Sequence, residues 1–209
     1  MTKIMRGTDI TLHDLKNQFG LRRVEDDLFF TEWKNDLPEI SPEDKKVLDK
    51  IKAGYFNLIE YPPTIEDTVK MAVLGPLLNL AGFYLPPFHI QAETSVRLSL
   101  TDEDIAIEGK IDVLVLKEQF WIMVIESKRV AFSVEIGLAQ ILAYMMTNPH
   151  PERPGFGLIT NGGSFLFIKL KRDLQKAQYA TSGIFELRNP GNDLYSVLGI
   201  MKRLALALE

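Results

Sequence analysis

Residues 109–128 read GKIDVLVLKEQFWIMVIESK, and this stretch decides the fold. Its two halves are rich in β-branched and aromatic residues, and Lys117 and Glu118 separate them, which is typical of a β-hairpin. Both halves are apolar on both faces, as strands are in the centre of a sheet that helices cover on both sides. The stretch therefore predicts a buried hairpin in a mixed α/β or α+β protein.

Three charged residues interrupt this apolar hairpin: Asp112 in its first strand, and Glu126 and Lys128 at the end of its second strand. A tight turn that pairs Asp112 with Val124 places Glu126 one same-face step further along the partner strand. Because side chains two residues apart share a face of a strand, we expect all three charged groups on one side of the sheet. A β-bulge would change this parity.

Two carboxylates and an ammonium group at the end of buried strands can form a metal site. Mg²⁺ prefers oxygen ligands and keeps waters and phosphate oxygens around it, so Asp112 and Glu126 can supply its protein ligands. Lys128 can then hold the attacking water and neutralise developing negative charge. The alternative is an ion pair of Asp112 with Lys128 or Lys110, beside a solvated strand end.

The flanking sequence predicts helices before the hairpin, and both helix and strand after it. Ser41 precedes a proline and two acidic residues, which indicates the start of a helix. A second helix is expected from Thr64, with a bend at Pro76, and the Asn-Gly pair at 161–162 predicts a turn between two more strands. The other expected elements are a strand over 89–100, a helix over 134–146 and a closing helix over 192–209.

The composition of the 209 residues, 46% apolar and 25% charged, is that of an ordinary globular protein. The net charge of −4 excludes a purely electrostatic DNA binder, although it allows a DNA enzyme with acidic metal ligands. The chain has no cysteine, which excludes thiolate chemistry, and His13, His89 and His150 are far apart in sequence. There is no apolar run of membrane-span length and no secretion signal, so we expect a soluble cytoplasmic protein.

We expect two parts in the chain. Residues 1–60 are interpreted as a helical N-terminal extension, with a weak helical pattern over residues 24–33, and residues 61–209 as the main domain. This domain is expected to have a central mixed sheet flanked by helices.

The order of the charged residues resembles a known signature. Asp112, thirteen intervening residues and then Glu126-Ser127-Lys128 are similar to the D…(D/E)xK motif of the PD-(D/E)xK nuclease superfamily, with Ile111 where proline often precedes the aspartate. The resemblance implies a restriction-endonuclease-like core and Mg²⁺ as cofactor, with Mn²⁺ as a substitute. It assigns Asp112, Glu126 and the backbone carbonyl of Ser127 as metal ligands.

Two further stretches extend the resemblance to type I restriction enzyme R subunits. The run EDTVKMAVLGPLLNLAGF, residues 66–83, resembles the first helix of their amino-terminal nuclease domain, which implies that Glu66 faces the metal. Asp67 and Glu60 are the alternatives for this acidic residue. The run FGLITNGGSFLFIKL, residues 156–170, resembles the hairpin that follows later in that domain.

Gln140 and Tyr144 stand four residues apart and resemble the QxxxY element of RecB-like nucleases. The resemblance implies that Gln140 orients the nucleophile or a phosphate and that Tyr144 supports it. It implies an endonuclease that hydrolyses DNA, of a restriction or defence type. Because a cut through both strands of a duplex needs two active sites, we expect a homodimer with twofold symmetry. No ATP-binding Walker A pattern occurs in this chain. A catalytically idle nucleic-acid-binding or assembly module is the alternative, and the sequence does not separate DNA from RNA as substrate.

Overall fold

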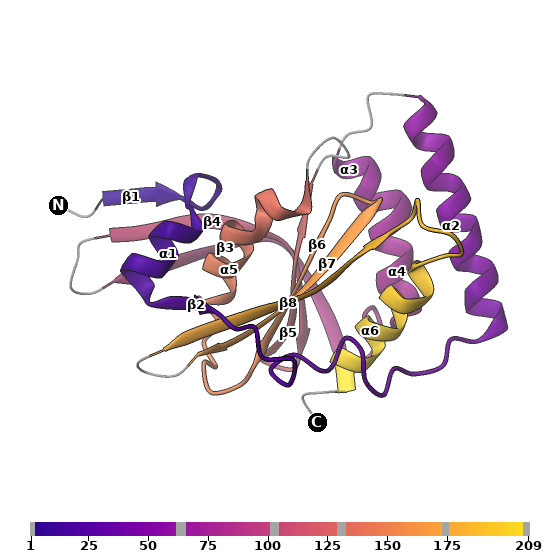
Figure 1. Ribbon diagram of the computed structural model, residues 1–209. Coiled ribbons are helices and arrows are strands. Elements are labelled where there is room, and N and C mark those ends of the chain that lie inside the picture. Colours follow the sequence, from indigo (N-terminus) through magenta and orange to yellow (C-terminus); the bar gives the residue numbers. More distant parts are fainter. Residues whose placement is uncertain (1–2, 62–65, 101–104, 129–132, 173–175, 207–209) are drawn as a thin grey trace.

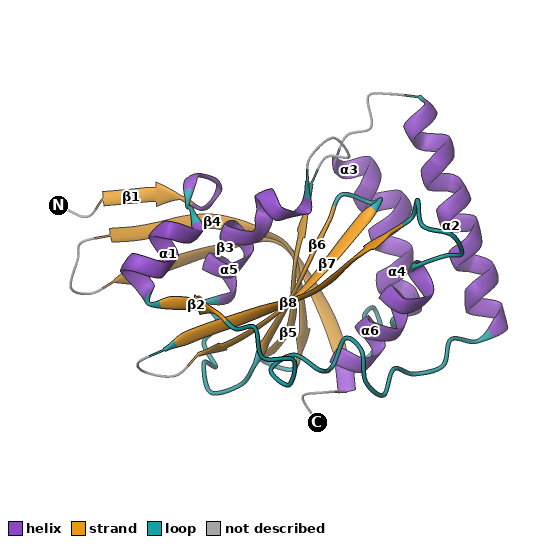
Figure 2. Ribbon diagram, in the orientation of Figure 1, coloured by secondary structure: helices purple, strands orange, loops and turns teal. Residues whose placement is uncertain are grey.

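The computed structural model describes residues 3–61, 66–100, 105–128, 133–172 and 176–206. Within these residues the chain forms one mixed sheet of eight strands and five helices (Figures 1 and 2). The strands are β1 (Lys3–Arg6), β2 (Leu21–Arg23), β3 (Phe88–Leu100), β4 (Ile105–Lys117), β5 (Phe120–Ser127), β6 (Gly155–Thr160), β7 (Ser164–Arg172) and β8 (Ala177–Glu186). The mixed α/β class expected from the sequence is confirmed.

The helices are α1 (Leu12–Phe19), α2 (Pro42–Glu60), a continuous helix made of α3 (Glu66–Val69), a π-helical segment (Lys70–Leu74) and α4 (Gly75–Leu80), then α5 (Leu138–Met145) and α6 (Leu194–Leu206). Short 3₁₀ turns precede α1 and α5, at Gly7–Asp9 and Val134–Gly137. No helix of the described residues is long and apolar enough to cross a membrane.

The sheet runs in the order β1-β4-β5-β6-β7-β8-β2, and β3 also pairs with β4. The β5–β6 pair is parallel, and so are the pairs that β1 and β2 make at the two ends of this order. The other pairs are antiparallel. One side of β4 changes neighbour along its length, because β1 pairs with Ile105–Glu108 and β5 pairs with Val113–Lys117. Asp112 lies where this change occurs.

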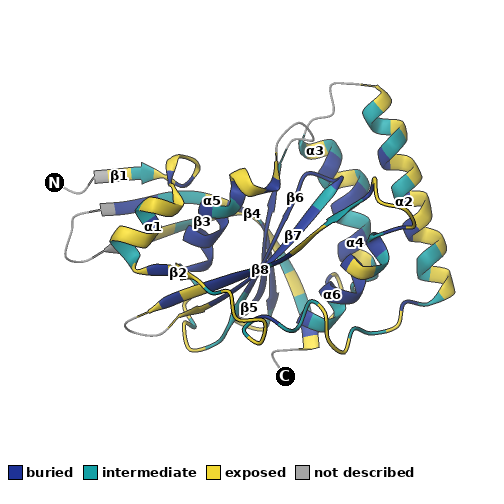
Figure 3. Ribbon diagram, in the orientation of Figure 1, coloured by how far each residue is buried: buried dark blue, intermediate teal, exposed yellow. Residues whose placement is uncertain are grey.

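Helices cover the sheet on both faces, and alternate residues of the central strands point into the two layers. Leu158 of β6 packs with α2, α4 and α6, whereas the next residue, Ile159, packs with α1 and α5. Phe167 and Ile168 of β7 divide in the same way. The central strands are correspondingly buried, whereas the outer face of α2 is exposed (Figure 3).

The helix starts follow the local sequence. The Ser41 hydroxyl accepts a hydrogen bond from the Asp44 backbone at 3.0 Å, and Pro42 occupies the first turn, which confirms the expected start of α2. The expected bend at Pro76 takes the form of the π-helical segment just before it. Because proline lacks an N–H and crowds the preceding turn, a wider turn keeps the helix continuous. The expected restart at Thr64 lies outside the described residues.

The N-terminal part is less helical than expected. Residues 24–33 are turns and irregular backbone, so the helix predicted there is wrong. Residues 3–6 and 21–23 instead form β1 and β2. Neither strand has a strong pattern of its own, because each is short and depends on a partner more than 90 residues away in sequence, at Ile105 or Ala177.

The β4–β5 hairpin closes on Lys117 paired with Phe120, one residue away from the expected turn. A β-bulge shifts the register by a further residue, so that Val113 pairs with Ile125. Continuing this register by one position brings Asp112 opposite Glu126. The expected pairing of Asp112 with Val124 is therefore wrong, but two shifts of one residue leave the parity unchanged.

Candidate active site

Glu126, Lys128 and Gln140 form a closed hydrogen-bonded triangle at the end of β5. The Oε1 atom of Glu126 accepts from Lys128 Nζ at 2.6 Å and from Gln140 Nε2 at 2.6 Å. Lys128 Nζ also donates to Gln140 Oε1 at 2.8 Å. Because the Glu126 side chain is only 4% exposed, this triangle contains a largely buried ion pair between Glu126 and Lys128.

Gln140 and Tyr144 lie one turn apart on α5 and therefore share a helix face. The Gln140 side-chain amide donates to the Tyr144 hydroxyl at 3.1 Å. A Cβ atom at Gly109 of β4 or at Gly7 would collide with the Tyr144 ring, so both positions need glycine. The ring is thus fixed on two sides, and it positions Gln140 against Glu126.

Gly137, at the start of α5, has a packing role of the same kind. A Cβ atom there would lie 3.2 Å from Lys128 Cε and 3.3 Å from Ile159 Cγ2. Such contacts are tighter than ordinary van der Waals packing. The glycine lets Lys128 pass close to the helix and reach Glu126 and Gln140.

Asp112 lies beside this triangle, and both of its oxygens are engaged. The Oδ2 atom accepts from the Ser127 backbone N–H at 2.7 Å, and Oδ1 accepts from Lys70 Nζ at 3.2 Å. Ser127 also has a buried hydroxyl with no hydrogen-bond partner among the described residues. Its backbone carbonyl as a metal ligand stays a prediction.

Lys70, in the π-helical segment, lies among three carboxylates. Its ammonium is 3.0 Å from Glu66 Oε1, 3.2 Å from Asp112 Oδ1 and 3.9 Å from Glu93 Oε1. The alternative ion pairs expected for Asp112, with Lys128 or Lys110, are not the ones formed among the described residues. Lys128 pairs with Glu126, and Lys70 takes the place beside Asp112.

The three acidic residues considered for the helix differ in position. Glu66 is half-buried and is linked to Asp112 through Lys70. Asp67 and Glu60 are exposed. The structure therefore brings Glu66 toward the predicted site residues.

Sequence reasoning missed Lys70 and Glu93. Lys70 stands four residues after Glu66, and this spacing on a helix was a signal for an ion pair. Glu93 adopts a positive φ of 53° within β3, which no local pattern indicates.

Burial sets the electrostatics of Glu126. It raises the pKa of this carboxyl to about 7, and the negative charge of Asp112 adds to the rise, while Lys128 opposes it. Burial alone would lower the pKa of the Lys70 ammonium, but the hydrogen bonds and charges of Glu66 and Asp112 outweigh it and raise the pKa. Burial also raises the pKa of the Tyr144 hydroxyl.

One atom of the site lacks the partner that its burial demands. The Oε2 atom of Glu126 is buried and has no hydrogen-bond partner among the described residues. A buried carboxylate oxygen is costly unless a donor or a cation satisfies it. Together with Asp112 it forms a pair of oxygen donors, which is the number of carboxylates that commonly holds Mg²⁺ beside waters and phosphate.

The described residues contain no group of three or more His, Cys, Asp or Glu side chains arranged to hold a metal ion. Asp112 and Glu126 are therefore considered only as a pair of carboxylates. The Lys70 ammonium lies 3.2 Å from Asp112 and 3.0 Å from Glu66, so it would compete with a cation for these oxygens.

No model of a known protein family matches the chain, and no curated protein matches it either. The resemblance to nucleases therefore depends on the residues quoted above.

Proposed function

We propose that the chain is a metal-dependent nuclease that hydrolyses phosphodiester bonds of DNA. The observation that carries the proposal is the environment of Glu126. One of its oxygens is held by Lys128 and Gln140, and the other is buried near Asp112 with no hydrogen-bond donor among the residues that the structure describes. These are the residues to which the sequence resemblance assigns the chemistry, and they come from two strands and a helix.

Asp112 and Glu126 would hold Mg²⁺, with Mn²⁺ as a substitute, and Glu66 and the Ser127 carbonyl are the further expected ligands. When bound, it would stabilise charge on the phosphate and lower the pKa of a water.

Three side chains, those of Lys128, Gln140 and Tyr144, would supply the other functions of the site. Lys128 donates to two acceptors, and its ammonium can orient the attacking water and stabilise the developing negative charge. Gln140 fixes the position of Lys128 and of Glu126, and Tyr144 holds Gln140 in turn.

The proposal extends to the fold and the setting. The sheet with helices on both faces would be a restriction-endonuclease-like core. Most of it comes from residues 61–209, while residues 1–60 add β1 and β2 to the same sheet. The enzyme would act in the cytoplasm as a homodimer with one site per strand of duplex DNA, in a restriction or defence role.

A cleavage assay tests the proposal. The substrates are supercoiled plasmid, linear duplex, single-stranded DNA and RNA, each with Mg²⁺, Mn²⁺ or EDTA. We expect metal-dependent cleavage of DNA by the wild type and none by Asp112→Asn or Lys128→Gln. The control is Asp67→Asn, which removes an exposed carboxylate from the neighbouring helix and should leave cleavage unchanged.

Thermal melting shows whether each variant is folded, which must be known because breaking a partly buried ion pair destabilises a protein. Cleavage that survives in folded Asp112→Asn protein would refute the assigned site. Cleavage of RNA alone would refute the substrate.

A second candidate function, an idle nucleic-acid-binding or assembly module, is favoured by Lys70. Its ammonium lies where a metal-binding acidic cluster would need an open place, so the site is neutralised from within the chain. Calorimetric titration with Mg²⁺ separates the two functions. A nuclease must bind Mg²⁺ through Asp112, whereas nucleic-acid binding with no Mg²⁺ binding and no cleavage would support the module.

A further inference from the structure

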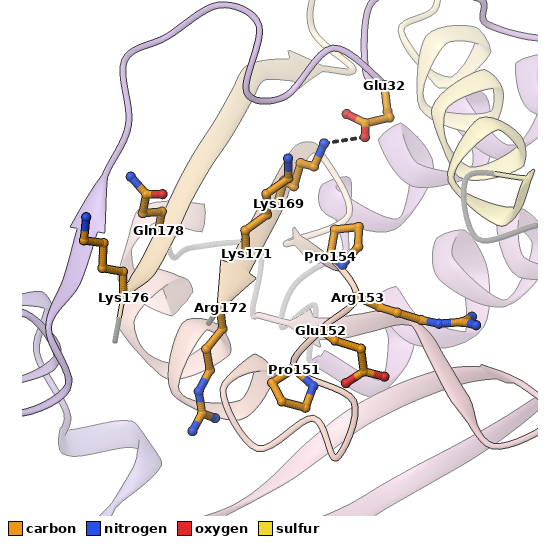
Figure 4. A pocket seen from close by; sticks show the side chains of 10 residues that line it. All are labelled: Glu32, Pro151, Glu152, Arg153, Pro154, Lys169, Lys171, Arg172, Lys176 and Gln178. Carbon is orange, nitrogen blue, oxygen red and sulfur yellow. Dashed lines mark hydrogen bonds and ion pairs between the residues drawn. The ribbon is translucent and has the colours of Figure 1, made fainter. Parts of the chain in front are cut away.

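Two lysines with little exposure are paired in different ways. Lys169, in the cavity of Figure 4, is 5% exposed, and its ammonium forms an ion pair with one carboxylate, that of Glu32. Lys70 of the π-helical segment has three carboxylates within 3.9 Å, those of Glu66, Asp112 and Glu93. Within the described part of the chain, Lys70 therefore has alternative partners that Lys169 does not have.

The three carboxylates around Lys70 are not equally close. Its ammonium lies 3.0 Å from Glu66 Oε1 and 3.2 Å from Asp112 Oδ1, which are hydrogen-bond distances. Glu93 Oε1 lies 3.9 Å away, beyond hydrogen-bond distance. The Glu93 side chain is 58% exposed, and its other oxygen lies 4.0 Å from the ammonium of Lys110. Glu93 is therefore near Lys70 without a hydrogen bond to it, and its exposed side chain has room to adjust.

The backbone of β3 is irregular at Glu93. The residues before and after it pair regularly with β4, whereas Glu93 itself has no partner in the described β3–β4 ladder. Continuing the pairing of Ala92 with Val113 by one position brings Glu93 opposite Asp112. Its φ of 53° lies in the left-handed region, which costs free energy for a residue with a Cβ atom. The irregularity of β3 thus falls at the level of Asp112 on β4.

A divalent cation on Asp112 would disturb the pairing of Lys70. It would lie close to the Lys70 ammonium, which contacts the same carboxylate, and two positive charges at such short range repel each other. Lys70 would then lose Asp112 as a partner, and Glu66 as well if Glu66 also binds the cation. The Lys70 side chain is only 23% exposed, so an ammonium without a carboxylate is costly there.

We propose that Glu93 is a positioning residue that accepts the Lys70 ammonium when a divalent cation binds to Asp112. Glu93 is the remaining carboxylate within reach in the described part of the chain, and Lys70 has a flexible stem of four carbons. Lys70 then exchanges one carboxylate for another, so cation binding does not leave an unpaired ammonium in the site. The inference rests on the proposed function, because it needs a cation at Asp112.

Calorimetric titration with Mg²⁺ alone, without nucleic acid, tests the proposal through binding and needs no cleavage. Glu93→Gln keeps the length of the side chain and removes its charge. We expect this variant to bind Mg²⁺ about threefold more weakly than the wild type, a modest effect because a half-exposed ion pair contributes little. Lys70→Met removes the competing ammonium and keeps an unbranched chain, and it should bind Mg²⁺ about tenfold more tightly.

The double variant separates this role from a simple effect of charge. If Glu93 acts by accepting Lys70, Glu93→Gln should have no effect on Mg²⁺ affinity in the Lys70→Met background. If Glu93 instead attracts the cation through space, or only supports the fold, the weakening persists in that background. Persistent weakening in the double variant would therefore overturn the proposal.

Asp67→Asn is the matched control, because Asp67 is an exposed carboxylate on the same helix and, among the residues described, forms no ion pair with Lys70. Weakening of Mg²⁺ binding by Asp67→Asn equal to that by Glu93→Gln would count against a special role of Glu93. Thermal melting checks the fold of each variant, and Glu93→Gln should melt with the wild type because its side chain is exposed.

The outcomes also separate this inference from the proposed function. Mg²⁺ binding by the wild type that Glu93→Gln leaves unchanged would overturn the role of Glu93 and leave the proposed function intact. No Mg²⁺ binding by either the wild type or Lys70→Met would refute the metal site itself.

Discussion

Replacing Glu126 with glutamine probes the electrostatics of the candidate active site through protein stability. The ordinary pKa of this carboxyl is 4.5, and burial raises it to about 7 in the folded chain. Below pH 4.5 the group is protonated in both the folded and the unfolded state. Between pH 4.5 and 7 the unfolded chain ionises this carboxyl while the folded chain still keeps it protonated, so stability falls as the pH rises, and the loss is complete once the folded chain ionises as well. At 1.36 kcal/mol per pH unit, the loss amounts to about 3 kcal/mol.

The assay is urea unfolding in EDTA at about pH 5 and about pH 8, because most of the loss falls between these values. The free energy of unfolding of the wild type should fall between them by at least 2 kcal/mol more than that of Glu126→Gln. The comparison cancels the other titrating groups and any constant cost of the substitution. Asp67→Asn, which removes a carboxylate at an exposed position, is the control. Equal pH dependence in the wild type and Glu126→Gln would refute the reasoning.

Three further predictions concern packing and cations. Gly109→Ala should lower the free energy of unfolding by about 1–3 kcal/mol in chemical denaturation, because the new Cβ collides with the Tyr144 ring. Gly54→Ala, in open space on α2, should raise it by about 0.5–1 kcal/mol, and a loss there would contradict the described packing. Lys70→Ala should lower stability in EDTA by about 1–3 kcal/mol. Added Mg²⁺ should also raise the melting temperature of Lys70→Ala more than that of the wild type, because no ammonium then competes for Asp112. An equal response of the two melting temperatures would count against this competition.

The central hairpin shows which features of the structure the local sequence pattern can predict. The expected same-side grouping of Asp112 and Glu126 agrees with the structure, although the turn and the bulge each moved the register by one residue. Apolar pattern shows which segments are strands and which faces are buried. It does not show where a strand gains an extra residue, because that depends on packing against other elements.

Most other contacts of the candidate site could not be predicted without the tertiary structure. The Gln140–Tyr144 spacing is local, and their hydrogen bond follows from one helical turn. Lys70 reaches Asp112 only because the fold brings this helix beside β4, since the two residues are 42 positions apart. The same reason applies to the buried Lys169, whose ion-pair partner Glu32 is 137 positions away in sequence.

The strands β1 and β2 have a consequence for how the chain folds. They come from one short N-terminal segment, yet they stand at the two opposite ends of the strand order. Their partners, β4 and β8, are synthesised later, and β8 is the last strand of the sheet. β2 therefore cannot pair before β8, the last strand of the sheet, has been made. Unpaired strand edges are sites of aggregation, and β1 and β2 cover edges of β4 and β8 in the folded chain.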